Sequence, residues 1–188
     1  MNFLVGVLSP TRTVGLICCL VNLAACVVAF GIGRGNPGRG RLAATLAALQ
    51  SALLVDLIFN GRWLLHDRLM NDAIALKIYE RRNEFQPAAL ALVAALVAAG
   101  AMWGLRRLRG RVGAVLAVCG MLAWLGCWCV EVISLHSIDA LLYRSLDGIK
   151  AVSVVWICCS LMIGTGILWD AVAGESASRL NEPAEEMR

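Results

Sequence analysis

The stretch VGLICCLVNLAACVVAFGI, residues 14–32, contains no charged residue, and Asn22 is its one amide side chain. A transmembrane helix needs about 20 apolar residues to cross the hydrocarbon core of a bilayer. Lipid offers peptide groups no hydrogen-bond partner, so a spanning segment of this kind has to be helical. The stretch therefore predicts a membrane-spanning helix.

Four further apolar segments of similar length follow in the 188 residues, and 60% of the chain is hydrophobic against 16% charged. A soluble domain has about 45–50% apolar and about 25% charged residues. We expect an all-α polytopic membrane helix bundle with five transmembrane helices and short helical connectors on the outer face. Residues 1–170 should form one domain, and residues 171–188 a polar, disordered cytoplasmic tail. The expected spans are 14–32, 42–59, 87–105, 112–130 and 151–169.

The connectors predict an orientation. Residues 33–41 and 106–111 are short, carry seven arginines and contain no acid. Dense basic loops beside a span are retained in the cytoplasm. We therefore expect an external N-terminus, a cytoplasmic C-terminus and a location in a cell membrane of the bacterial inner-membrane type. Residues 60–86 and 131–150 would then form an outer-face cap.

The two cap segments differ in pattern. The apolar residues of the first wrap around much of a helix, which predicts contact on more than one side. The second has an apolar stripe from Leu135 to Ile149 at helical spacing, which predicts one interfacial helix.

Two acids near the span ends need an explanation, because a carboxylate is costly within a span. Asp56 lies inside the second expected span, and Glu131 follows the fourth. We favour the interpretation that each is an interfacial acid paired with a basic residue, which for Asp56 is either Arg62 or a basic residue of another helix. The alternative is a small transporter or proton-coupled carrier that uses both acids.

The two histidines, His66 and His136, each follow a leucine just beyond an even-numbered span. Two imidazoles on one side of the membrane could ligate haem iron or, with Glu131 and Asp139, a divalent metal ion. The alternative is an interfacial helix whose polar face meets water, and we favour it because no recognised ligand motif is present.

Further residues suggest contact with an anion or a partner protein. Paired arginines suit carboxylate or phosphate groups, although such a run is more often a solvated turn with internal ion pairs. The candidates are Arg62, Trp63, Arg81, Arg82 and Tyr143.

Small residues predict close helix packing. Gly100 and Gly104 have the spacing that lets membrane helices approach each other, and the alanine-rich third span is expected to lie centrally in the bundle. The eight cysteines all fall within spans and include no CxxC pair, so we interpret them as packing residues.

No motif for catalysis or nucleic-acid binding is present. The leading functional hypothesis is a non-catalytic subunit, anchor or assembly factor of a membrane complex, with a cap that binds a partner or lipid. The partners expected are the lipid bilayer and other membrane subunits or a second copy. A haem- or metal-binding redox protein and a small transporter are the alternatives.

Overall fold

Five long helices dominate the structure, a computed structural model that describes residues 9–134, 136–146 and 149–180. Each is long and apolar enough to cross a membrane, which confirms the predicted all-α fold and makes this a multi-pass membrane protein. Their bounds lie within a few residues of the expected spans, except at the C-terminus. The helices are α2 (Pro10–Ile32), α3 (Pro37–Phe59), α5 (Arg82–Arg107), α6 (Val112–Ile133) and α8 (Ala151–Leu180).

Shorter elements connect these helices. A 3-10 turn, η1 (Gly33–Gly35), joins α2 to α3, while α4 (Gly61–Ala75) and η2 (Tyr79–Arg81) join α3 to α5. Between α6 and α8 lie α7 (His136–Leu142) and an antiparallel pair, β1 (Ser145–Leu146) and β2 (Ile149–Lys150). The prediction of one helix through this connector is therefore wrong, because the chain turns after Leu142 to reach the start of α8.

Local sequence explains several helix ends. Pro10 occupies the first turn of α2, where its missing N–H costs nothing. The Asn36 side chain caps α3 by accepting hydrogen bonds from the N–H groups of Gly38 and Arg39. Asn60 then ends α3 in the left-handed conformation, with φ at 60°, and leads directly into α4.

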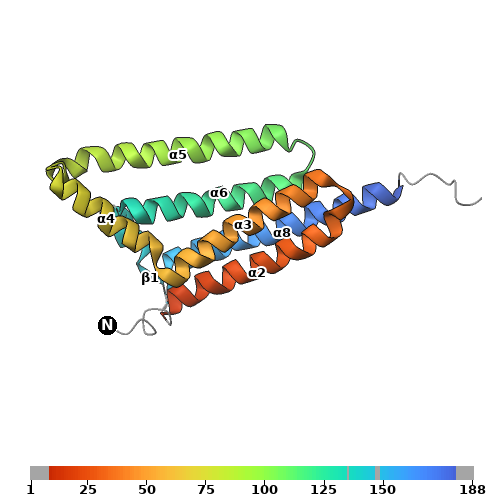
Figure 1. Cartoon of the computed structure of the whole chain (residues 1–188), viewed down its shortest axis with the longest axis horizontal. Coiled ribbons are helices and arrows are strands. Elements are labelled where there is room, and N and C mark those ends of the chain that lie inside the picture. Colours follow the sequence, from red (N-terminus) through yellow and green to blue (C-terminus); the bar gives the residue numbers. More distant parts are fainter. Residues whose placement is uncertain (1–8, 135, 147–148, 181–188) are drawn as a thin grey trace, which may run out of the picture.

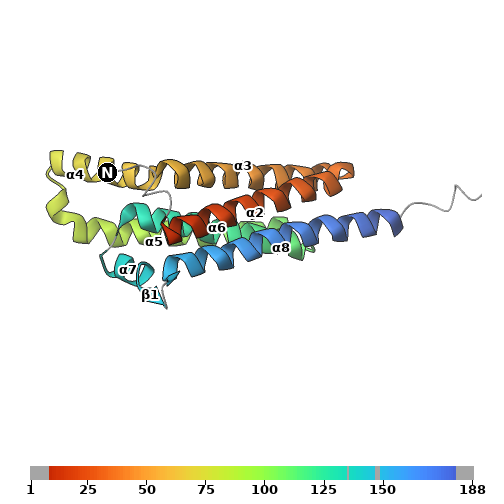
Figure 2. The same cartoon turned by 90° about the horizontal axis from the view of Figure 1, so that it is seen from below.

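Four of the long helices form a bundle, and the fifth lies at its edge (Figures 1 and 2). α2, α3, α6 and α8 lie close together, and α8 packs against both α2 and α6. α5 lies at the edge and packs mainly on α6. The expectation of a central third span is therefore wrong: alanine side chains bury little area, and one face of α5, containing Gly100 and Gly104, is enough to pack on Leu122 and Val118 of α6.

The closest helix contact is between α6 and α8. A Cβ atom added at Gly113 would lie 2.6 Å from the Gly166 carbonyl oxygen, and one at Gly166 would lie 2.6 Å from the Ala117 nitrogen. Nearer the other end of this helix pair, the indole rings of Trp124 and Trp156 stack with centroids 6.4 Å apart. The glycines thus let two backbones touch, while the tryptophans fill the wider space.

The final helix is longer than expected. α8 continues to Leu180, so the predicted disordered tail is helical over its first ten residues. Alanine and glutamate favour helix in this segment, and the missing side chain of Gly174 leaves room for the guanidinium of Arg39. Residues 181–188 of the predicted tail lie outside the described residues.

We name the two ends of the bundle by their residues. The cap end is where α2 begins and α3 ends, and it carries α4, α7 and the β1–β2 pair (Figure 2). The arginine end is where α3 and α6 begin, beside the two arginine-rich connectors.

Candidate functional site

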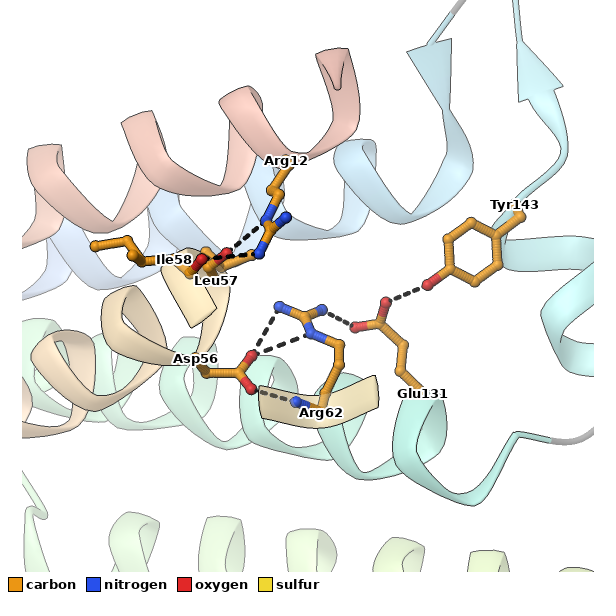
Figure 3. Close-up of polar contacts among 7 residues, drawn as sticks. All are labelled: Arg12, Asp56, Leu57, Ile58, Arg62, Glu131 and Tyr143. Atoms are coloured by element: carbon orange, nitrogen blue, oxygen red, sulfur yellow. Dashed lines mark hydrogen bonds and ion pairs between the residues drawn. The ribbon is translucent and has the colours of Figure 1, made fainter. Parts of the chain in front are cut away.

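A buried arginine organises the cap end. Arg62 lies in the first turn of α4 and is 5% exposed. The tight turn at Asn60 brings it back over the end of α3, where its backbone N–H donates to Asp56 Oδ1 at 2.6 Å. Its Nε and Nη2 atoms lie 3.0 and 2.9 Å from Asp56 Oδ2 (Figure 3). This pair confirms the interpretation of Asp56 as an acid bound to Arg62.

The same guanidinium reaches a second helix. Its Nη1 atom donates to Oε2 of Glu131 at 2.6 Å, and Glu131 is 3% exposed near the end of α6. Tyr143 follows α7 and donates its hydroxyl hydrogen to the other carboxylate oxygen, Oε1, at 2.7 Å. Burial, together with the charge of Glu131, raises the pKa of Tyr143. The tyrosine is therefore held as a hydrogen-bond donor.

Arg12 is a member of the site that the sequence reasoning missed. It lies in the first turn of α2 and donates to the backbone carbonyls of Leu57 and Ile58 at the end of α3 (Figure 3). These carbonyls are near the C-terminus of α3, where helices attract cations. One signal was available: Arg12 is the only charged residue among residues 1–33.

A pocket of about 290 Å³ opens beside this network. Its lining combines charged and aromatic side chains from α2, α4, α6, α8 and β2, together with Tyr143, which follows α7. Arg62 also lies against an aromatic wall, with its guanidinium 5.1 Å from the centroid of the Trp156 ring. The lining includes Arg12, Arg62, Trp63, Glu131, Tyr143, Lys150 and Trp156.

A second charged cluster lies at the arginine end and was also missed. Asp170 of α8 is 3% exposed. Arg111, just before α6, binds both of its carboxylate oxygens at 3.0 and 2.6 Å, and Arg39 of α3 lies 3.7 Å away. The sequence placed Asp170 at the end of the last span, on the same side as both arginine-rich connectors, but did not identify its partners.

Two amides are buried between the charged clusters. Gly15 of α2 lies against Leu57 of α3. Asn22 lies two helical turns after Gly15 along α2, and Gln50 lies two turns before Leu57 along α3. Because α2 and α3 are antiparallel, Asn22 and Gln50 are at the same level. Both residues are fully buried.

Only some of the polar side-chain atoms of these two amides have a hydrogen-bond partner. Ser160 of α8 lies 3.2 Å from Asn22 Oδ1 and donates toward it. Among the described residues, the Nδ2 atom of Asn22 and both polar side-chain atoms of Gln50 have no hydrogen-bond partner.

The histidine hypothesis is tested only in part. His66 Nδ1 lies 2.9 Å from the carbonyl oxygen of Val132, so its ring is fixed against the end of α6. Asp139 accepts a hydrogen bond from Ser134 at 2.6 Å. The side chain of His136 lies outside the described residues, so its pairing with His66 stays a prediction. No group of three metal-ligating side chains occurs within the described part of the chain.

The residues predicted to contact an anion or a partner protein lie in two separate parts of the structure. The Trp63 ring lies 6.4 Å from that of Tyr143, so the two cap segments meet through these aromatic residues. Arg81 instead forms an exposed ion pair with Glu84 at 2.7 Å, which fits the solvated turn expected for this run. The side chain of Arg82 is outside the described residues.

Comparisons with protein families, with characterised proteins and with solved structures found no match.

Proposed function

We propose that this protein is a non-catalytic subunit, anchor or assembly factor of a membrane complex. In this proposal α5 packs against another membrane helix, from a partner subunit or a second copy. The cap end faces outward from a bacterial-type inner membrane and binds lipid or a partner. The arginine end and the C-terminus then lie in the cytoplasm, as dense basic loops favour.

The observation that carries the proposal is the exposure of α5. Only 6% of its most apolar 18-residue stretch is buried, against at least 28% in each of the other four long helices. Its outward face carries the exposed Leu92 and Leu96 and, beside them, a row of exposed small residues, which favour close approach of a second helix. These exposed residues include Ala88, Ala91, Ala95 and Ala98.

The buried charges support a structural role for the bundle itself. Arg62 is bound on both sides by Asp56 and Glu131, and Asp170 is bound by two arginines. A carrier that used Asp56 and Glu131 would have to break these contacts during each cycle. Charges that neutralise one another across helices are better suited to fixing helix positions.

A photo-crosslinking experiment tests the proposal. A photoreactive amino acid replaces Ala95 on α5 or, as a matched control, Val28 on α2, which is 52% exposed. We expect protein adducts from position 95 and lipid adducts alone from position 28, in membranes of the native host. The mass of the adduct distinguishes a partner subunit from a second copy. Lipid adducts alone at both positions would refute the proposed subunit role.

A further inference from the structure

The cap-end pocket retains positive charge. Among the described residues, three cationic side chains line it, those of Arg12, Arg62 and Lys150, and Glu131 is the one carboxylate. Asp56 lies behind Arg62 and neutralises a second positive charge. One positive charge therefore remains, which favours a ligand that carries a single negative charge.

Two of these cations retain capacity to bind a ligand. Each of the three guanidinium nitrogens of Arg62 already contacts Asp56 or Glu131. Arg12 uses Nε and Nη2 on backbone carbonyls, and its Nη1 group has no partner among the described residues. The Lys150 ammonium lies 4.8 Å from the centroid of the Tyr143 ring and forms no ion pair with the described residues.

The first turn of α2 adds hydrogen-bond donors to the same pocket. Among the described residues, the first backbone N–H of this turn to form a hydrogen bond is that of Thr13, which donates to the Ser9 carbonyl. The N–H groups of Thr11 and Arg12 precede it, and the Ser9 side chain makes no capping bond to them. Ser9 and Thr11 also line the pocket. Free N–H groups at a helix start favour phosphate and other anions.

The level of the pocket in the membrane indicates where the anion comes from. The pocket lies where α2 and α8 begin and α3 ends. A 23-residue helix such as α2 is roughly 34 Å long, slightly more than the roughly 30 Å hydrocarbon core, so its ends reach the headgroup layer. Below the pocket, α2 exposes Ile17, Leu20 and Val21, a surface suited to an acyl chain.

We propose that the cap-end pocket binds the phosphodiester headgroup of an anionic phospholipid. Arg12, Lys150 and the first N–H groups of α2 hold the phosphate, and the lipid tails lie along α2. This inference rests on the proposed function, because it names the ligand of the lipid-binding cap.

Native mass spectrometry of the full-length protein measures the binding. The probes are phosphatidylglycerol, phosphatidylcholine and free glycerol 3-phosphate. We expect phosphatidylglycerol to bind most tightly, and Lys150→Gln to weaken it about fivefold, as loss of one basic residue near an anionic surface predicts. Lys77→Gln is the matched control, because Lys77 is exposed and is not among the residues that line the pocket. It should leave the affinity unchanged.

Adduct mapping with a photoreactive phosphatidylglycerol separates this pocket from the arginine end. We expect adducts on residues 9–21 that decrease in Lys150→Gln. Equal affinity for the two lipids, equal effects of the two lysine variants, or free glycerol 3-phosphate binding as tightly as the lipid would each overturn the proposal. If the pocket does not bind lipid, the protein crosslinks from position 95 are still expected. If the protein is not a subunit of a complex, those crosslinks are absent while the affinity for phosphatidylglycerol is unchanged.

Discussion

Arg62 and Glu131 are separated by 69 positions in the chain, yet their side chains meet at 2.6 Å in the buried cap end. The contact joins α4 to the end of α6 and leaves neither charge unpaired. Because Asp56 holds the other side of the guanidinium, one arginine fixes the relative positions of three helices.

Removal of this arginine should destabilise the fold severely. Arg62→Ala leaves the buried Glu131 and the partly buried Asp56 without their cation, and loss of one partner from a buried ion pair costs about 3–5 kcal/mol. Reversible unfolding in detergent measures the free energy of unfolding. Arg81→Ala, which breaks an exposed pair with Glu84, should change that free energy by about 0.5 kcal/mol or less.

A compensating variant separates charge from packing in this cluster. Arg62→Met combined with Asp56→Asn and Glu131→Gln removes all three charges while keeping similar side-chain volumes. We expect it to recover much of the stability lost in Arg62→Ala. A triple variant as unstable as Arg62→Ala would show that packing, rather than unpaired charge, explains the loss.

Tyr143→Phe should destabilise the protein in a pH-dependent way. The change leaves Glu131 Oε1 without its donor, at a cost of about 1–3 kcal/mol. Burial raises the folded-state pKa of Tyr143, so its contribution is complete below the ordinary tyrosine pKa of about 10 and decreases as the pH rises above it. Unfolding measured from pH 8 to 11 should therefore show the two proteins converging. A difference that stays constant over this range would contradict the assignment.

The sequence predicted the five helices well because membrane spans are specified by local composition. Long apolar runs determine helix positions whatever their neighbours are, so most bounds agree with the structure. The ion pair between Asp56 and Arg62 was also accessible, since the two residues are six positions apart.

Contacts between distant segments were not accessible from the sequence. Nothing local indicates that Arg111 meets Asp170, or that Tyr143 binds Glu131, because these contacts depend on which helices are neighbours. The edge position of α5 was missed for the same reason. An alanine-rich span is compatible with a position at the centre of the bundle and also with a position at its edge, where it can pack against a further helix.

The α6–α8 contact should not tolerate a methyl group. In Gly166→Ala the new Cβ would lie 2.6 Å from the Ala117 nitrogen, so a backbone has to move, and we expect a loss of roughly 1–3 kcal/mol in the free energy of unfolding. Gly31→Ala is the control, because a Cβ there meets nothing within 4 Å. It should be neutral or stabilising, as helix propensity predicts. Similar losses in the two variants would refute close packing at Gly166.

The unpaired amide of Gln50 should be replaceable with a gain in stability. Gln50→Met removes two buried polar atoms that have no partner among the described residues, and we expect stabilisation of roughly 1–3 kcal/mol. The same change at Gln86 removes hydrogen bonds to the carbonyls of Ile133 and Ser134 and should destabilise the protein. Destabilisation by Gln50→Met would show that this amide holds a partner such as an internal water molecule.

The central position of α8 has a consequence for biogenesis. The α2–α3 and α5–α6 hairpins can each form as soon as they enter the membrane. Through most of the thickness of the bundle, however, the two hairpins are joined by α8, which is synthesised after the other four long helices. Until residues 151–180 leave the ribosome, the nascent chain consists of two separate hairpins linked mainly at α4. Assembly of the bundle is therefore a late event, and a chain that ends before residue 151 exposes the glycine face of α6 to the lipid.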